Sequence, residues 1–365
     1  MTKGENNLQM NICDLLGQML NKECVDAVLV PKKLPFGEGV VQTLITDENK
    51  LKEAKPLAFV MPVSTGTIIS EMTKVEPSEK KIAAVMKPCE IRAAVELLKL
   101  KQAAFDNIII IGVDCPGTYS VNDYKEIISE GKSPMDIYLS NVKEGKDDEK
   151  MRAACKVCEY SIPENVDITI GILGSDLKTP LIMYNSEKGK DIIKILGIKP
   201  QEDMKKREEE ISKLKKRRLA AWDTLLQSTQ KDVGGLDNLL AFFESCIKCH
   251  NCMDVCPVCY CRECFFESPT FEYEAQKYLS WSQKKGILKM PKDTLLFHLT
   301  RMNHMATSCV GCGMCEQACP SKIELLRIYK TVGHNAQKVF DYVPGRSVDE
   351  ELPLLTFREE ELEPR

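Results

Sequence analysis

Cysteines recur with one spacing at two places in the second half of the chain. Each run reads Cys-x2-Cys-x2-Cys-x3-Cys-Pro, and the runs begin at Cys246 and Cys309. This is the bacterial ferredoxin pattern, in which thiolates hold 4Fe–4S clusters and the fourth cysteine of each run ligates the other cluster. We therefore predict two cubane clusters held by Cys246, Cys249, Cys252, Cys256, Cys309, Cys312, Cys315 and Cys319. The alternative is structural zinc, which favours paired Cys-x2-Cys knuckles over this run.

Four further cysteines lie in the first half of the chain, at positions where strands are expected to end. Cys89 and Cys115 each follow a short apolar run, and Cys155 and Cys158 form a Cys-x2-Cys pair. Strand-to-loop positions gather at one end of a sheet, which is where α/β domains build their sites. Four thiolates converging there would hold a third 4Fe–4S cluster. The spacing alone also allows each cysteine to be a small buried apolar residue.

Three more cysteines crowd directly behind the first ferredoxin run, at Cys259, Cys261 and Cys264. Two interpretations stay open. In the first, these thiols complete a further cluster or a zinc site with a fourth ligand from elsewhere, such as His250 or a partner chain. In the second, they remain unligated and shield the clusters. His250 itself lies inside the first cysteine loop, where its N–H either bonds a cluster sulfur or is simply exposed to solvent.

Apart from its cysteines, the composition is ordinary for a folded protein. The 365 residues are 43% hydrophobic and 28% charged, with a formal net charge of −4. This length predicts two or three domains. The mild acidity argues against a nucleic-acid partner, which usually meets a basic surface. The sequence shows no Ser–His–Asp arrangement, Walker loop or G-x-G-x-x-G fingerprint, so no catalytic residue is assigned.

The 17 cysteines point to the compartment in which the chain works. The first ten residues are polar, and no apolar segment of a signal peptide follows them. The longest apolar run, residues 108–113, is too short to span a membrane. We therefore expect a cytoplasmic, reduced and oxygen-sensitive protein in which clustered cysteines serve metal or redox chemistry. Cys13 and Cys24 lie outside the clusters and are expected in the core.

Short apolar runs alternate with amphipathic stretches over residues 1–200, which predicts an α/β or α+β domain. The expected strands are 26–30, 40–45, 58–61, 82–85, 108–113, 168–172 and 181–183. The expected helices are 10–20, 67–72, 90–99 and 188–196. These elements have to bring the four cysteines of this half to one end of a sheet.

The rest of the chain divides into three predicted segments. Residues 201–235 are dense in charge with a thin apolar stripe, which predicts a long, largely solvated linker helix; a basic partner-binding surface at 215–218 is the alternative. Residues 236–340 carry both ferredoxin runs, and the long spacer 257–308 favours a mostly α-helical ferredoxin-like domain. Residues 341–365 are expected to form an extended tail that lies on a neighbour or is disordered.

Three segments of the first half carry a resemblance to a known family. They read K-P-C-E-I-R-A around Cys89, G-V-D-C-P-G around Cys115 and C-K-V-C-E from Cys155. In this order they resemble the beta subunit of deazaflavin-coenzyme-reducing hydrogenase and formate dehydrogenase, over residues 1–195. The resemblance implies that Cys89, Cys115, Cys155 and Cys158 hold a 4Fe–4S cluster beside a bound FAD. In that family the flavin exchanges a hydride with a deazaflavin or nicotinamide-type carrier.

The flavin site is the part where this sequence departs from the family. Glu90 stands where members often have Gln, and residues 7–20 carry only Gly17 in place of the Gly-Gly and Thr of many members. The best candidate for binding FAD is the hydroxyl-rich turn of Ser64, Thr65, Gly66 and Thr67. This turn opens an expected helix, whose N–H groups suit an anion. An ordinary helix N-cap is the alternative interpretation.

Together these motifs predict a flavin-dependent electron-transfer subunit of a multi-subunit oxidoreductase. A flavin accepts a hydride and releases single electrons, which iron–sulfur clusters carry onward one at a time. By resemblance the partners are subunits of a formate dehydrogenase, hydrogenase or heterodisulfide-reductase-type complex. Deazaflavin coenzyme, NAD(P)H or ferredoxin would be the electron carrier, and the motifs do not choose among them. The competing hypothesis is a flavin-free iron–sulfur relay that connects two redox enzymes.

Overall fold

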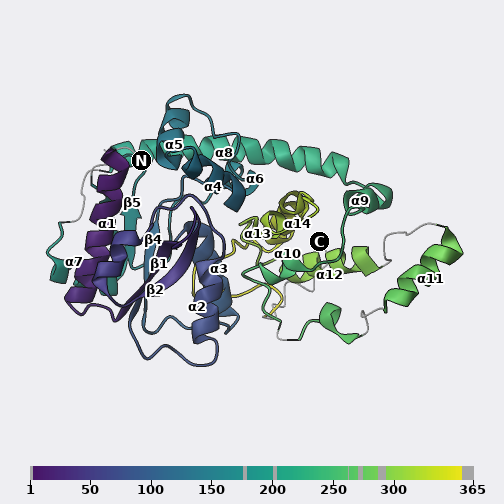
Figure 1. The fold of residues 1–365 in the computed structure, drawn as a ribbon, viewed down its shortest axis with the longest axis horizontal. Coiled ribbons are helices and arrows are strands. Elements are labelled where there is room, and N and C mark those ends of the chain that lie inside the picture. The colour runs from purple at the N-terminus through teal and green to yellow at the C-terminus, as the bar shows by residue number, and fades with distance from the viewer. Residues whose placement is uncertain are drawn as a thin grey trace.

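The computed structural model describes residues 3–175, 179–199, 204–261, 263–269, 274–286 and 293–355. Figure 1 shows an α/β half at one end of the molecule and a helical half at the other, joined along one side by a long helix. The predicted class, an α/β domain followed by a linker helix and a mostly helical domain, is confirmed. The residue boundaries of the predicted domains remain a prediction.

A six-stranded mixed sheet forms the centre of the α/β half. Its strands are β1 Ala27–Lys33, β2 Val40–Ile45, β3 Ile82–Met86, β4 Ile108–Val113, β5 Ile168–Gly171 and β6 Leu181–Tyr184. Their order across the sheet is β2-β1-β3-β4-β5-β6, with β1, β3, β4 and β5 parallel and the two edge strands antiparallel. The neighbours β3 and β4 are buried along their whole length, which explains their continuous apolar sequences.

Helices cover both faces of this sheet (Figure 1). They are α1 Lys3–Asn21 and α7 Glu187–Leu196 on one face, with the 3-10 helix Glu48–Glu53, and α2 Thr65–Thr73 and α3 Pro88–Lys99 on the other. Successive side chains of a strand point to opposite faces. Ala83 of β3 therefore packs in the first layer and Ala84 in the second. This packing fixes the loops after β3 and β4, which carry two of the predicted site cysteines.

Two details of this half differ from the prediction. The strand predicted over residues 58–61 is not formed, because these residues make an isolated bridge to another loop instead of joining the sheet. They are apolar because they are buried against the core. Two helices appear where none is predicted, α4 (Val121–Ser129) and α5 (Pro134–Lys143). Each begins at a serine hydroxyl, of Ser120 and Ser133, that caps the first turn.

One long helix, α8 (Lys205–Asp232), runs from the α/β half to the helical half (Figure 1). Its charged composition predicts a largely solvated surface, but Arg207 and Arg218 are buried. Arg207 forms an ion pair with Asp114, and Arg218 Nη1 donates to Ser161 Oγ at 2.6 Å. The predicted helix is therefore present, but it is packed onto the α/β half through basic side chains that the sequence pattern assigns to solvent.

Short helices surround the ferredoxin runs in the second half. They are α9 Leu236–Phe242, α10 Asn251–Asp254, α11 Ala275–Lys285, α12 Asp293–Met305, α13 Met314–Gln317 and α14 Leu325–Val339, with a 3-10 helix at Phe265–Glu267. Phe243, Phe297 and Tyr329 form the core of this half together with several cysteines. Its packing therefore depends in part on what those cysteines hold. Among the described residues of the whole chain, no helix is long and apolar enough to cross a membrane.

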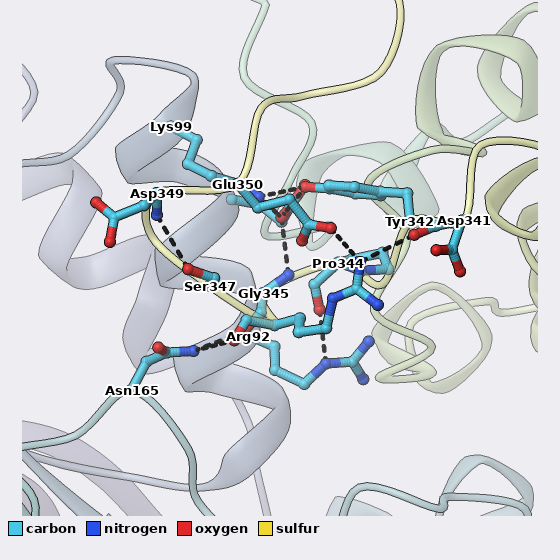
Figure 2. A network of polar contacts seen from close by, with 12 residues as sticks. Arg92, Lys99, Asn165, Asp341, Tyr342, Pro344, Gly345, Ser347, Asp349 and Glu350 are labelled. Carbon is cyan, nitrogen blue, oxygen red and sulfur yellow. Dashed lines mark hydrogen bonds and ion pairs between the residues drawn. The ribbon is translucent and has the colours of Figure 1, made fainter.

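Residues 341–355 return from the helical half to helix α3 of the α/β half, and we call them the strap (Figure 2). The Tyr342 hydroxyl donates to Glu96 Oε1 at 2.5 Å, and the Gly345 N–H donates to the same oxygen at 2.8 Å. The predicted extended tail is thus, over its described part, a contact between the two halves. Residues 356–365 lie outside the described residues.

Candidate metal centres

The four cysteines of the α/β half come together at one end of the sheet. Cys89 lies in the first turn of α3, directly after β3, and Cys115 follows the neighbouring strand β4. Cys155 belongs to the short helix α6 (Ala153–Lys156), and Cys158 follows it. Burial is the largest cause that raises the pKa of Cys89, and the charge of Cys115 is the next. Burial also raises the pKa of Cys115, and the charge of Cys155 is the next cause there. Thiols that interact in this way lie close together, and we call these four the α/β group.

Neighbouring side chains fix the loops of the α/β group. The Cys155 sulfur accepts a hydrogen bond from the Thr118 N–H at 3.3 Å. Arg218 of α8 donates to the Ser161 hydroxyl, while the Ser161 carbonyl accepts the Cys115 N–H at 2.9 Å. Helix α8 therefore helps to position the Cys115 loop, which gives its buried Arg218 a structural role at the site.

The eight cysteines of the two ferredoxin runs form two groups, and each group takes its fourth member from the other run. The first ferredoxin group is Cys246, Cys249, Cys252 and Cys319, and the second is Cys309, Cys312, Cys315 and Cys256. Burial, and then the charge of Cys256, raise the pKa of Cys309 and of Cys312, the latter to about 12. This exchange of the fourth cysteine is the arrangement that the ferredoxin pattern predicts.

The two cysteine loops share one backbone shape. Gly311 and Gly313 have φ of +68°, and the residues at the same places in the first run, Lys248 and His250, have φ of +58°. Positive φ is strained for a residue with a Cβ, whereas glycine adopts it freely. Such strain persists where the surroundings impose it, and it is common at functional sites. The similar backbone conformations of the two cysteine loops indicate that both loops bind the same kind of ligand.

Arg301 of α12 lies between the two ferredoxin groups. Its buried charge indicates which kind of ligand these cysteines could bind. Arg301 is 4% exposed, and its Nε and Nη1 atoms have no hydrogen-bond partner among the described residues. Burial lowers its pKa, but the neighbouring Tyr329, Cys256 and Cys252 raise it by more. The guanidinium carbon lies 4.7 Å from the centroid of the Tyr329 ring, which offsets part of the cost of burying the charge. The nitrogens without a hydrogen-bond acceptor remain costly. Anionic 4Fe–4S clusters at these thiols would neutralise the Arg301 charge, so the residues present fit such clusters.

The α/β group and the second ferredoxin group meet across the boundary between the two halves. After burial and two larger electrostatic effects, the charge of Cys312 also raises the pKa of Cys89. Arg152 Nη2 donates to the Cys312 carbonyl at 2.8 Å. A Cβ added to Gly313 would come 2.5 Å from Ala154 Cβ, so the loops are closely packed here. The three groups therefore form a row, in the order α/β group, second ferredoxin group, first ferredoxin group.

His298 of α12 contacts a cysteine of the first ferredoxin group. This contact was not predicted from the sequence. The His298 Nε2 lies 3.4 Å from the Cys246 sulfur and its Nδ1 lies 3.3 Å from the Tyr329 hydroxyl. Burial is the largest cause that lowers the pKa of His298 to about 3, so the ring is neutral at pH 7. His250, the histidine considered for such a contact, stacks on Phe297 with ring centroids 4.6 Å apart, and its buried Nε2 has no hydrogen-bond partner among the described residues. No spacing along the chain links His298 to Cys246, so only the fold reveals it.

The turn considered for FAD opens helix α2, and the N–H and hydroxyl of its Thr65 are already engaged. Glu90 Oε1 accepts hydrogen bonds from the Thr65 N–H and hydroxyl, both at 2.8 Å. Glu90 is 1% exposed, and a Cβ on Gly66 would come 2.8 Å from the Glu90 carbonyl oxygen. A buried carboxylate therefore occupies the place that a flavin phosphate would need at this helix end. In this arrangement Ser64, Thr65, Gly66 and Thr67 do not fit FAD.

The three remaining cysteines of the helical half line one cavity of about 420 Å³. Its lining includes these thiols and two basic residues of α12, namely Cys259, Cys261, Cys264, Arg301 and His304. Burial, and then the charge of Cys256, raise the pKa of Cys259 to about 12. The cavity therefore adjoins the second ferredoxin group. His250, considered as a fourth ligand here, is not among its lining residues.

All 17 cysteines are free thiols. Within the described ranges, no group of three or more His, Cys, Asp or Glu side chains is arranged to hold a metal ion. A 4Fe–4S cluster makes a different demand, because each of its irons takes one thiolate and the four sulfurs stand further apart. The assignment of the three groups as cluster ligands stays a prediction.

Comparison with known proteins defines the class of the chain. Residues 79–210 match the family described as the C terminus of the coenzyme F420 hydrogenase/dehydrogenase beta subunit. Residues 242–323 match the 4Fe-4S dicluster domain. These matches, together with the cysteine groups, make the chain an iron–sulfur electron-transfer subunit of an oxidoreductase.

Two curated relatives extend this likeness over nearly the whole chain. The F420-dependent formate dehydrogenase subunit beta of Methanocaldococcus jannaschii is 30% identical, covering 93% of this chain and 92% of the relative. The F420-dependent formate dehydrogenase 1 subunit beta of Methanococcus maripaludis is also 30% identical, covering 93% and 90%. The chain belongs to the coenzyme F420 hydrogenase/dehydrogenase beta-subunit family.

A solved structure shows a weaker likeness. It is a chain of the F420-reducing NiFe hydrogenase complex of Methanosarcina barkeri, with a TM-score of 0.48 and 14% sequence identity. The match covers 64% of this chain and 90% of that chain. At this level the likeness adds nothing to the family assignment.

Proposed function

We propose that this chain is the electron-transfer beta subunit of a multi-subunit oxidoreductase, connecting a two-electron carrier to one-electron partners through three 4Fe–4S clusters. The row of cysteine groups carries the proposal. Cys89 and Cys312 bring the α/β group beside the second ferredoxin group, and Arg301 lies between the second group and the first. Adjacent clusters in a row would let single electrons cross from one half of the molecule to the other.

The side chains of this chain would hold the clusters, orient them and balance their charge. Each of the three cysteine groups would supply four thiolates to one cluster, which accepts and releases one electron at a time. Arg301 would offset negative charge between the two ferredoxin groups. Arg152 holds the Cys312 loop, and Lys330 donates to the Val157 carbonyl beside Cys158. Such neighbours orient the ligands and tune the clusters.

The carrier and the partners are proposed from the family. The names of the two relatives support deazaflavin coenzyme F420 as the two-electron carrier and a formate dehydrogenase subunit as the partner. NAD(P)H, ferredoxin, or subunits of a hydrogenase or heterodisulfide reductase are alternatives in the same class. The many free thiols suit the reducing cytoplasm. The resemblance implies FAD for exchange with the carrier, but we assign it no residues, because the α2 turn does not fit it.

A flavin-free relay is the second candidate function, and the contact between Glu90 and Thr65 favours it. This contact engages the Thr65 N–H and hydroxyl at the N-terminus of α2, two groups that would otherwise be open to a flavin phosphate. Without a flavin, the chain would take up single electrons at the α/β group and would connect two redox enzymes rather than exchange hydrides.

Flavin analysis of the anaerobically purified complex separates these two functions. The leading proposal expects about one FAD per chain and reduction of the clusters by the reduced deazaflavin coenzyme. A complex that contains iron but no flavin, and that does not take up added FAD, would establish the relay instead.

Replacement of Cys89 tests the row itself. We expect Cys89→Ser to lose about four irons per chain and to uncouple the carrier from the ferredoxin groups. Cys24→Ser is the matched control, because Cys24 is a half-buried cysteine outside all three groups. Iron content and the rate of cluster reduction are measured in both variants. Full electron transfer in Cys89→Ser would show that the α/β group is not part of the path.

A further inference from the structure

The cavity behind the first ferredoxin run contains ligands that the proposed function leaves unused. Cys259 and Cys264 are half-buried and Cys261 is exposed, and all three line the same space of about 420 Å³. Arg301 and His304 line it as well. We propose that this cavity holds a fourth iron–sulfur cluster, ligated by Cys259, Cys261, Cys264 and His304.

Arg301, which also adjoins the ferredoxin groups, brings a buried cation to the lining of this cavity. Arg301 lines the cavity and is 4% exposed, and its guanidinium carbon lies 4.7 Å from the centroid of the Tyr329 ring. Two of its three nitrogens, Nε and Nη1, have no hydrogen-bond partner in the described part of the chain. A buried cation without a hydrogen-bond acceptor is costly, and an anion beside it removes that cost. A cluster held by three thiolates carries negative charge and would supply the missing partner from this side, as the ferredoxin groups would from the other.

The size of the cavity favours a cluster over zinc. A structural zinc ion is enclosed tightly by its four ligands and leaves no free space between them. The space here is many times larger than one ion, although three thiols face it. A cluster of several irons and sulfides fills such a space and still reaches each thiolate. Unligated thiols, the simpler interpretation, would leave the ferredoxin groups as the source of anions for Arg301 and would place none on its cavity side.

His304 completes the ligand set from helix α12. It lies three residues after Arg301, and residues three apart on a helix are neighbours on one face. Both side chains therefore reach the same cavity. Histidine replaces cysteine in some iron–sulfur centres and raises their potential. A cluster with three cysteines and one histidine would accept electrons from neighbours that have cysteine ligands only.

The position of the cavity would place the fourth cluster beside the second ferredoxin group, as a side path from the row of three clusters. Cys259 packs into the same apolar cluster as Cys256 and Cys312 of the second ferredoxin group. On the other side, Cys261 is exposed and Phe265 is 59% exposed. One electron that leaves the second ferredoxin group would reduce the fourth cluster by one electron, close to the surface where a partner can take it.

Metal analysis and EPR of the complex, purified anaerobically, test this inference. We expect about sixteen irons per chain and no stoichiometric zinc. Cys261→Ser, Cys264→Ser and His304→Ala should each remove one EPR signal and leave the others unchanged, and the two cysteine variants should lose about four irons. Cys261 is exposed, so its replacement does not disturb the core. Cys24→Ser is the control and should keep all signals.

The inference rests on the proposed iron–sulfur function, and the outcomes separate the two. About twelve irons, with no loss in Cys261→Ser, would overturn the fourth cluster and leave the row of three intact. Zinc that disappears in Cys261→Ser would overturn it as well. Loss of the signal in Glu263→Gln but not in His304→Ala would overturn the assignment of His304, because Glu263 also lines the cavity. A complex without any cluster signal would overturn both proposals.

Discussion

At the scale of single residues, His298 shows how a side chain distant in the sequence reaches a predicted cluster ligand. Its Nε2 lies 3.4 Å from the Cys246 sulfur, and Phe243 stacks on its ring at 3.9 Å. Because burial keeps the imidazole neutral, one ring nitrogen can donate to the sulfur while the other accepts from the Tyr329 hydroxyl. Hydrogen bonds to the sulfurs of a cluster raise its reduction potential.

We expect His298→Phe to lower the potential of the cluster proposed at the first ferredoxin group by on the order of 50 mV, the equivalent of about one hydrogen bond. Phenylalanine keeps the stack on Phe243 and loses the donor. An anaerobic redox titration followed by EPR measures the shift. Tyr329→Phe is the control, because it keeps the imidazole and should shift the potential less. An unchanged potential in His298→Phe would rule out the contact as a tuning element.

Cys13 represents a buried thiol outside the cysteine groups. It lies in α1, is 8% exposed, and its Sγ donates to the Ala54 carbonyl at 3.8 Å. Burial raises its pKa from 9.0 to about 11, so the thiol stays protonated in the folded state where the unfolded chain already ionises. Its contribution to stability is therefore complete below pH 9 and is lost as the pH rises through about 11.

We expect this ionisation to cost the protein about 2 kcal/mol of unfolding free energy between pH 9 and pH 11. In Cys13→Ala the loss over the same interval should be smaller by that amount. Denaturant unfolding of both proteins at the two pH values measures the difference. Parallel pH dependences would mean that Cys13 ionises as freely in the folded state as in the unfolded state.

At the scale of elements, the strap and helix α3 connect the two halves beside the α/β group. Cys89 stands at the start of α3, and the strap binds further along the same helix through Glu96. Gly345 of the strap has φ of +72°, and a Cβ added there would lie 2.4 Å from the Arg92 Cα. Glycine is needed at this position both for its backbone conformation and for the close approach of the chains.

Comparison of two glycines separates these two requirements. Gly37 has φ of +71° and nothing within 4 Å of an added Cβ, so Gly37→Ala should cost only the backbone strain of about 1 kcal/mol. Gly345→Ala should cost roughly 1–3 kcal/mol more, because it also forces the strap away from α3. Thermal unfolding and protease cleavage within residues 341–355 measure both effects. Equal losses in the two variants would show that the strap is not tightly held.

At the scale of the whole molecule, the two halves differ in what stabilises them. The α/β half has a six-stranded sheet with apolar layers on both faces. The helical half has short helices whose core contains Cys252 and packs against several other cysteines, and it surrounds the buried charge of Arg301. Clusters would therefore contribute to the folding of the second half far more than to that of the first.

Removal of the clusters by oxidation and a chelator should unfold the helical half first. Limited proteolysis of the treated protein should leave a resistant fragment that contains the sheet, while the loaded protein resists over both halves. The physical reason is that the buried Arg301 cation would lose the anions beside it and the inward-facing thiols would lose their iron. Equal protection of both halves after removal would contradict this dependence.

The cluster chemistry could be predicted from the sequence because its determinants are local. The thiolates of one cysteine loop are a few residues apart, so their spacing is visible along the chain, and even the exchange of Cys256 and Cys319 between runs follows from the pattern. Buried strands such as β3 and β4 were equally visible as apolar runs. The strand predicted over residues 58–61 was wrong, because a loop that is buried against a core is as apolar as a strand.

Only the tertiary structure decided how these local units are arranged. The order of the three cysteine groups, the contact of His298 with Cys246 and the inward direction of Arg218 each join segments far apart in the sequence. The same holds for Glu90, which occupies the helix end that the sequence favoured for a flavin phosphate. Spacing along a chain specifies what a loop can bind, whereas packing between distant segments specifies which loops become neighbours and which helix ends remain free.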